Sequence, residues 1–336
     1  MIYIVYYEWK NTAGNHAGMA YLFRYIKEQN PKTVKLIRVP HYIAKKANKY
    51  IQRIYVFLIS LYIFVFSTPR TKVLFTEYLG NVSGNQTKMA YWLNKLHWRG
   101  GIYGMVHLSE SHLKELYGSD EYIRKQLSLV NEIIVLGSTL SDYFKRLGYG
   151  EKIWLTYHYV DTSYYFPLDK SNKETGMLNV IAMGSLKRNH HLLYDIAKRT
   201  PDIHYTICMG QADLSLIFKD LENVILCGFM SESELLHRMQ MADVSMSVMD
   251  DTVGSNVITT SMACGLPQIV SDVGSIRDYC NDDNAIFCKN VDDFVVALNR
   301  LSCDRILLRS MSIAARNKAM DIDIKSFNKL FVGRFL

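Results

Sequence analysis

The sequence predicts an α/β fold built from two domains, and three observations lead to this prediction. Short apolar runs alternate with helical patterns over most of the chain, as in parallel sheets covered by helices. At 336 residues the chain exceeds the usual size of a single hydrophobic core. Residues 157–177 interrupt the alternation with a polar, aromatic stretch that contains Pro167 and Gly176, which is typical of a linker.

The first series of elements covers residues 2–156. Its last helix is expected to open at Ser138 and Thr139, which are good capping residues, and to end at Gly148. The other elements follow from apolar runs and helical spacing: strands at 2–8, 33–39, 73–78, 101–107, 132–136 and 152–156, and helices at 19–28, 87–96 and 110–117.

The second series begins after the linker. It predicts strands at 178–183, 203–209, 223–227, 243–248, 268–271 and 285–287, and helices at 190–198, 213–219, 231–240, 257–264 and 291–301. We place the N-terminal domain at residues 1–163 and the C-terminal domain at 164–323. A final helix, at about 324–336, is expected to cross back onto the N-terminal domain.

Composition excludes several classes of protein. Apolar residues make up 49% and charged residues 21%, which argues against disorder. The net charge of +7 fits either an anionic partner or a solvated Lys-rich surface. No dense Lys/Arg stripe with interleaved aromatic residues is present, so we expect no nucleic-acid partner. Six cysteines without a CxxC pair, and a start that lacks a secretory signal, favour a cytoplasmic location.

One apolar segment departs from the alternating pattern. Residues 54–66 carry no charge and follow Lys45, Lys46, Lys49 and Arg53. As a helix they span ~20 Å, too short to cross a bilayer. Two interpretations stay open: a helix buried against the sheet, or contact of residues 45–66 with an anionic membrane, on the inner face of the cytoplasmic membrane.

The stretch from Asn256 to Asp272 predicts a site for a phosphorylated ligand. A helix that starts near Asn256 runs into Gly265-Leu266-Pro267, and an apolar strand follows at once. The free N–H groups and positive dipole end of such a helix are suited to a phosphate.

Four stretches in this order resemble the retaining nucleotide-sugar glycosyltransferases of family 4. They are Asn131–Ser138 with Asp161–Pro167, similar to the "NGVDTxxFxP" motif; Val180–Arg188, similar to "ilyvGRLxxxK"; Asn223–Phe229 with Ala242-Asp243-Val244, similar to "NVxFxGxv…ADv"; and Ser261–Pro267 with Ser271–Arg277, similar to "EAMAcGlPVIxSdvGgixd". The resemblance runs from about Glu132 to Leu301.

This resemblance implies the GT-B fold, with two Rossmann-like domains and a cleft between them. It implies transfer of a hexose from a UDP- or GDP-sugar to a saccharide or lipid-linked saccharide, with retention and without a metal or other cofactor. The expected setting is the synthesis of a bacterial surface polysaccharide or lipopolysaccharide.

The resemblance also implies which residues bind the donor. Ser185 stands where the family has an Arg, so we expect Arg188, with Lys187 second, to supply the phosphate cation after Gly184. Backbone N–H groups of Gly254, Ser255 and Asn256, with Val257 behind them, are expected to face the sugar or phosphate. The remaining expected contacts are Gly228 and Phe229 beside the base, Gly14 and Asn15 near the diphosphate, and a catalytic His107 on the sugar.

Two departures leave an alternative open. The family's paired glutamates fall on Thr252 and Thr260, and a single hydroxyl replaces the bidentate acceptor that usually holds the ribose. Asp250 or Asp251 could replace the first glutamate. The alternative is therefore a catalytically impaired GT-B-like binding or scaffold protein, and a sugar-nucleotide epimerase is a third hypothesis. The Asp321-Ile-Asp323 spacing is interpreted as solvated carboxylates rather than metal ligands.

Overall fold

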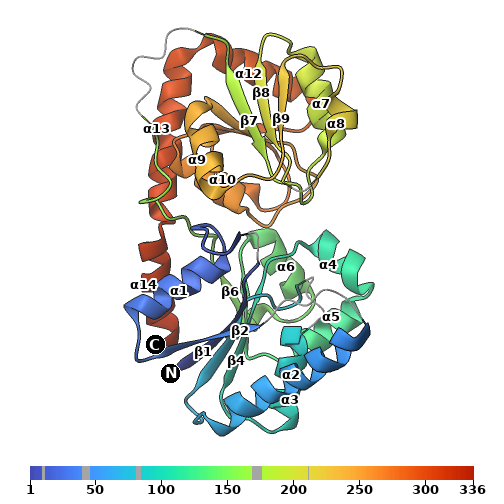
Figure 1. The fold of residues 1–336 in the computed structure, drawn as a ribbon, viewed down its shortest axis with the longest axis vertical. Coiled ribbons are helices and arrows are strands. Elements are labelled where there is room, and N and C mark those ends of the chain that lie inside the picture. Colours follow the sequence, from blue (N-terminus) through green and yellow to red (C-terminus); the bar gives the residue numbers. More distant parts are fainter. Residues whose placement is uncertain (10–11, 40–45, 81–84, 169–175, 211) are drawn as a thin grey trace. The chain divides into compact units, whose positions relative to one another are not determined.

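The computed structural model describes residues 1–9, 12–39, 46–80, 85–168, 176–210 and 212–336 (Figure 1). The chain forms two compact units. Unit 1 comprises Met1–Tyr157 and Phe327–Leu336, and unit 2 comprises His158–Ser326. Part of the predicted linker, at 169–175, lies outside the described residues, as does Lys45.

Unit 1 is built on a six-stranded parallel sheet in the order β2-β1-β3-β4-β5-β6. Strand β1, which lies between β2 and β3, is buried along its whole length, which matches its unbroken apolar sequence. The strands are β1 (Ile2–Tyr7), β2 (Val34–Val39), β3 (Lys72–Phe75), β4 (Gly101–Val106), β5 (Glu132–Val135) and β6 (Ile153–Leu155).

Helices cover this sheet. They are α1 (Met19–Gln29), α2 (Lys46–Val65), α3 (Asn85–Lys95), α4 (Glu110–Tyr117), α5 (Asp120–Leu127), α6 (Ser138–Arg146) and the last helix, α14 (Ile324–Phe335). From Phe327 onward α14 belongs to unit 1, where Phe331 packs against Phe23 and Phe335 packs against Tyr103 and Trp154.

Unit 2 holds a second six-stranded parallel sheet, in the order β12-β11-β10-β7-β8-β9. Its strands are β7 (Asn179–Met183), β8 (His204–Cys208), β9 (Val224–Cys227), β10 (Val244–Ser247), β11 (Gln268–Ser271) and β12 (Ala285–Cys288). Its helices are α7 (His190–Arg199), α8 (Ser215–Phe218), α9 (Glu232–Met241), α10 (Asn256–Ala263), α11 (Ile276–Tyr279), α12 (Val291–Cys303) and α13 (Arg305–Asp321). The prediction of two Rossmann-like α/β folds is confirmed.

The structure corrects several local predictions. Strand β3 ends at Phe75 rather than residue 78, because the chain turns at Thr76. The N-cap of α6 is Gly137 and makes no side-chain cap, so Ser138 is already helical. The sequence prediction omitted α5, α11 and α13; α13 buries only a narrow row of small or flexible residues, Met311, Ala315 and Ala319.

The prediction of solvated carboxylates at Asp321 and Asp323 is wrong for Asp323. This carboxylate is buried and accepts hydrogen bonds from the backbone N–H of Thr162 (3.2 Å) and from its hydroxyl (2.6 Å). A buried carboxylate needs such donors because its desolvation is costly. Asp323 therefore fastens the start of unit 2 to the end of α13.

Candidate functional site

The strand order of the unit 2 sheet locates its crevice. The order reverses between β7 and β10, and ligands of open α/β sheets bind beyond the carboxyl ends of strands at such a reversal. The loop after β7 carries Gly184 to Asn189, and the loop after β10 carries Val248 to Ser255. Most of the residues predicted to bind the donor therefore lie on these two loops and on the first turn of α10.

Backbone hydrogen bonds join the two loops. The N–H of Asn189 donates to the carbonyl of Val248 (3.1 Å), and that of Asp250 donates to the carbonyl of Lys187 (3.0 Å). A β-bridge also pairs Arg188 with Met249. Lys187 adopts a left-handed backbone conformation, with φ at 53°, which is uncommon for a residue other than glycine. The bonds from the β10 loop hold the segment that presents Arg188.

Arg188 is the most distinctive cation of this site. Its Nε donates to the carbonyl of Met183 (3.1 Å), and no carboxylate of the described residues forms an ion pair with it. Burial lowers the pKa of Arg188 to about 10, so the guanidinium stays charged at neutral pH. A partly buried cation without a counter-ion is a binding site for an anion.

Three described residues adjoin Arg188 or interact with its charge, and none of them is negatively charged: Gly184, Val257 and His190. A Cβ on Gly184 would lie 3.5 Å from the guanidinium Nη2 and 3.5 Å from Val257, so these three residues adjoin one another. Burial, and then the charge of Arg188, lower the pKa of His190, which keeps that ring neutral at pH 7. Ser185, where the family has an Arg, is exposed.

The turn that leads into α10 contains Gly254, which no other residue can replace without strain. Gly254 has φ at 105°, and an added Cβ would meet the ring of Tyr279 at 2.2 Å. The Ser255 side chain caps the helix by accepting from the N–H of Val257 (3.2 Å). The N–H of Gly254 donates to the hydroxyl of Thr252 (3.1 Å), so that donor is already engaged within the chain.

The side chains in place of the family's glutamates are held by local bonds. Thr260 is 7% exposed, and its hydroxyl donates to the carbonyl of Asn256 (2.6 Å) within the helix. The carboxylate of Asp251 accepts from the N–H of Thr252 (2.8 Å), and that of Asp250 accepts from the side chain of Asn189 (3.0 Å). The carboxamide oxygen of Asn256 is buried and lacks a hydrogen-bond partner among the described residues.

Two further predicted residues follow β9. Gly228 has no atom within 4 Å of an added Cβ, and Phe229 is 55% exposed. An exposed ring beside an open glycine offers a flat apolar surface at the end of the strand.

In unit 1 the strand order reverses between β1 and β3. Gly14 and Asn15 lie in the loop after β1, where Gly14 has φ at 91° and the N–H of Asn15 donates to the carbonyl of Thr12 (3.1 Å). His107 follows β4, and its Nε2 lies 2.7 Å from the carbonyl of Thr76. Because a carbonyl only accepts, Nε2 carries a hydrogen.

Glu77, which sequence reasoning missed, lies beside His107. Its Oε1 is 3.9 Å from Nε2 of His107. Burial raises the pKa of the Glu77 carboxyl, and the charge of His107 offsets only part of this rise. The available signal in the sequence was its position two residues after the apolar strand β3, because ligands of parallel sheets bind at the carboxyl ends of strands. The structure thus gathers Glu77 and His107 in unit 1, and Gly184, Arg188 and the start of α10 in unit 2.

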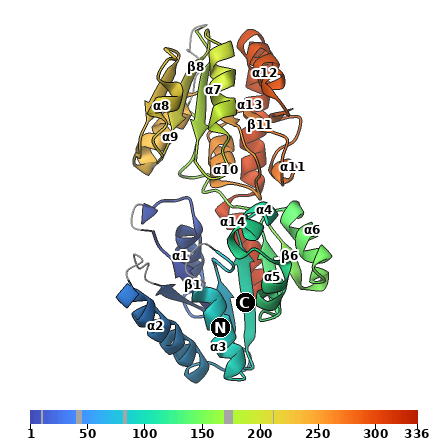
Figure 2. The ribbon, with the colours of Figure 1, turned by 90° about the vertical axis from the view of Figure 1, so that its right-hand side faces the viewer.

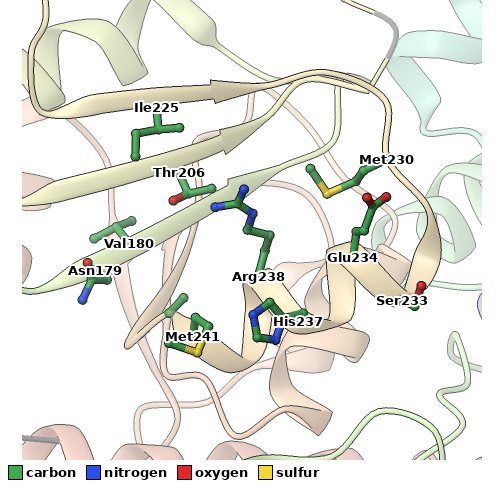
Figure 3. A pocket seen from close by; sticks show the side chains of 11 residues that line it. Asn179, Val180, Thr206, Ile225, Met230, Ser233, Glu234, His237, Arg238 and Met241 are labelled. Carbon is green, nitrogen blue, oxygen red and sulfur yellow. The ribbon is translucent and has the colours of Figure 1, made fainter.

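Unit 2 also contains a cavity that is separate from the loops after β7 and β10 (Figure 3). Its volume is about 770 Å³, and its lining residues come from β7, β8, β9 and α9; they include Asn179, Thr206, Ile225, Glu234 and Arg238. Asn179 and Val180 begin β7, so this cavity lies against the sheet away from the carboxyl end of that strand. It contains none of the predicted donor-binding residues.

Two kinds of feature are absent from the described residues. No group of three or more His, Cys, Asp or Glu side chains there is arranged to hold a metal ion. No helix in the same part of the chain combines the length and apolar character needed to cross a bilayer.

Comparison with known proteins agrees with this architecture. A search of curated protein sequences found no match. Among solved structures, sucrose-phosphate synthase from Thermosynechococcus elongatus shares 13% identity, covers 99% of this chain and 97% of its own, and gives a TM-score of 0.77. The lipopolysaccharide outer core galactosyltransferase WaaB, in its apo form, shares 14% identity over 99% and 100%, with a TM-score of 0.72. HepE from Anabaena, in complex with UDP, shares 14% over 99% and 98%, with a TM-score of 0.73.

The sequence of unit 2 matches a known protein family. Residues 168–318 match the family described as glycosyl transferases group 1, which includes the loops that carry Arg188 and the start of α10. Residues 168–318 therefore carry the sequence of group 1 glycosyl transferases, and the whole chain has the GT-B fold of two Rossmann-like units.

Proposed function

We propose that this protein transfers a hexose from a UDP- or GDP-sugar to a saccharide or lipid-linked saccharide, with retention of configuration and without a metal ion. The proposal rests mainly on the environment of Arg188. Its guanidinium is partly buried, lies where the strand order of the unit 2 sheet reverses, and has no ion-pair partner among the described residues. A nucleoside diphosphate supplies the missing negative charge, and HepE, of similar fold, has been solved with UDP and with UDP-glucose.

The chemistry follows from charge. When the bond between the sugar and the diphosphate breaks, negative charge grows on the leaving phosphate. Arg188 stabilises that charge by charge-assisted hydrogen bonds, and the N-terminal end of α10 adds its positive dipole. Retention, and activity without metal, rest on the resemblance to the family 4 enzymes. A Cβ on Gly184 would lie 3.5 Å from Nη2 of Arg188, so the absence of a side chain at Gly184 leaves that side of the guanidinium uncrowded.

In unit 1 we assign His107 to the transferred sugar and the surrounding unit to the acceptor. Its ring is fixed through Nε2 by the Thr76 carbonyl, which orients it at the end of β4. The likeness in fold to WaaB, a lipopolysaccharide outer core galactosyltransferase, supports a role in the synthesis of a bacterial surface polysaccharide or lipopolysaccharide.

The test is a panel of UDP-, GDP- and ADP-sugars with the purified protein, measuring release of nucleoside diphosphate. At least one donor is expected to be consumed, and Arg188→Ala should lower kcat/KM for it by ~100-fold or more. Arg199→Ala is the matched control, because Arg199 is an exposed arginine paired with Asp292. Equal activity of the two variants would contradict the role of Arg188.

The alternative, a catalytically impaired GT-B-like binding protein, is favoured by Thr252 and Thr260. The Thr260 hydroxyl is bonded to its own helix and cannot hold two ribose hydroxyls as a carboxylate does. This alternative predicts that UDP or GDP binds, with Arg188 needed for binding, while no donor sugar in the panel is consumed with any acceptor.

A further inference from the structure

Helix α2 carries an exposed apolar face. Six side chains along it are between 44% and 68% exposed, and we call them the α2 apolar face: Tyr50, Ile51, Ile54, Leu58, Tyr62 and Val65. At about 100° per residue they fall within roughly a third of the helix circumference. The opposite side packs inward through Val56, Ile59 and Ile63, which are at most 7% exposed. The helix therefore buries one apolar side and leaves another uncovered.

The neighbouring helix α3 extends this surface with aromatic side chains. Helices α2 and α3 lie side by side in both views (Figures 1 and 2), and Phe57 packs edge-on against Trp92 with ring centroids 5.0 Å apart. Tyr91 of α3 is 47% exposed. Amphipathic aromatic rings of this kind are enriched where proteins meet the interfacial layer of a membrane.

The charged residues of α2 and α3 are all positive. Neither α2 nor α3 contains an Asp or Glu. The guanidinium of Arg53 lies 5.8 Å from the ring centroid of Tyr50, and the ammonium of Lys95 lies 5.0 Å from that of Trp92. The Lys88 side chain on α3 is exposed. Desolvation of its ammonium, and then the charge of Arg53, lower the pKa of Lys88, so Lys88 and Arg53 are close enough to repel each other. An anionic partner would relieve this repulsion.

We propose that α2 lies flat on an anionic lipid bilayer, with the α2 apolar face inserted ~5–10 Å into the boundary between headgroups and acyl chains. Arg53, Lys88 and Lys95 then contact the anionic headgroups. A second copy of this chain is a poorer occupant, because its own positive face would meet these cations. Membrane contact of this kind requires only the α2 apolar face and these three cations. It does not require the donor chemistry of Arg188.

The first experiment is co-flotation of the purified full chain with lipid vesicles. Vesicles with ~30% phosphatidylglycerol should bind the protein at least about tenfold more tightly than pure phosphatidylcholine, and higher salt should weaken binding. Equal binding to both compositions, or none to either, overturns the proposal.

The second experiment tests the apolar contact. The triple variant Ile54→Ser, Leu58→Ser, Tyr62→Ser should bind the anionic vesicles at least about tenfold more weakly. The control pair Leu216→Ser, Ile306→Ser alters residues that are 83% and 84% exposed in unit 2 and should bind as the unaltered chain does. Equal loss in both variants overturns the proposal.

A third readout reports insertion directly and does not depend on weakened binding. A Leu58→Trp variant should shift its fluorescence emission to shorter wavelength when anionic vesicles are added, whereas Ile306→Trp should add no such shift. If sedimentation instead shows self-association that the triple variant abolishes, while Leu58→Trp shows no shift with vesicles, the face is a protein interface and the membrane proposal is wrong.

Discussion

At the scale of single residues, Arg188 combines partial burial, a hydrogen bond to Met183 and the absence of an ion-pair partner among the described residues. The resemblance in sequence identified it although the family's Arg position holds Ser185. What the sequence could not supply was its environment. The open backbone at Gly184 and the contact with Val257 depend on three-dimensional packing.

The pH dependence of donor binding follows from this environment. Burial lowers the pKa of Arg188 to about 10, and binding needs the charged form. Below pH 9 the guanidinium is almost fully charged, so this group should leave affinity unchanged between pH 7 and 9. As the pH rises through about 10, the charge and the affinity should fall together. Calorimetric titration of UDP across this range, with Arg188→Met as the control that lacks the transition, measures it.

Gly254 gives a residue-scale prediction for stability. Gly254→Ala would place a Cβ 2.2 Å from the Tyr279 ring in a backbone conformation with φ at 105°. We expect it to lower the free energy of unfolding by ~2–4 kcal/mol, visible as a lower Tm. Gly228→Ala is the control, because an added Cβ there meets nothing within 4 Å. Equal Tm values for the two variants would contradict the packing described.

Glu77 shows where residue-scale prediction from sequence ends. A carboxylate after an apolar strand is common, and only the strand order, with β3 beside β1 and β4, places it next to His107. Asp323 is a second example, because its burial depends on the return of the chain past Thr162.

At the scale of elements, alternation of apolar runs and helical patterns was sufficient to predict every strand and most helices. Amphipathic helices with a strong apolar stripe were predicted, whereas α13 was not. Its inward positions are small residues, Ala315 and Ala319, that pack closely against α10 and give little apolar periodicity. The short α11 has only four residues and little pattern to detect.

Arg316 on α13 makes an element-scale prediction. Its guanidinium donates to the carbonyls of Ala263 (2.6 Å), Tyr165 (2.8 Å) and Thr162 (3.1 Å), and so joins α13 to the end of α10 and to the start of unit 2. Arg316→Ala leaves these acceptors unpaired and should cost ~2–4 kcal/mol of unfolding free energy. Arg309→Ala, exposed on the same helix, should change it by less than about 0.5 kcal/mol in denaturant titrations. A small effect of Arg316→Ala would show that the three bonds contribute little.

At the scale of the whole chain, both units repeat one plan: a six-stranded parallel sheet whose strand order reverses between two inner strands. This plan explains why residues far apart in sequence gather at the carboxyl ends of the strands. The prediction of two α/β domains needed only the regular alternation of elements and the chain length, whereas the resemblance to family 4 implied that they are Rossmann-like. The strand order needed the structure, because sequence alone does not say which strands are neighbours.

The most direct test of the central claim is a crystal structure of this chain with bound UDP or GDP. We expect diphosphate oxygens at ~3 Å from the Arg188 guanidinium, beside the first turn of α10. A diphosphate bound elsewhere, for example in the cavity that Arg238 lines, would contradict it.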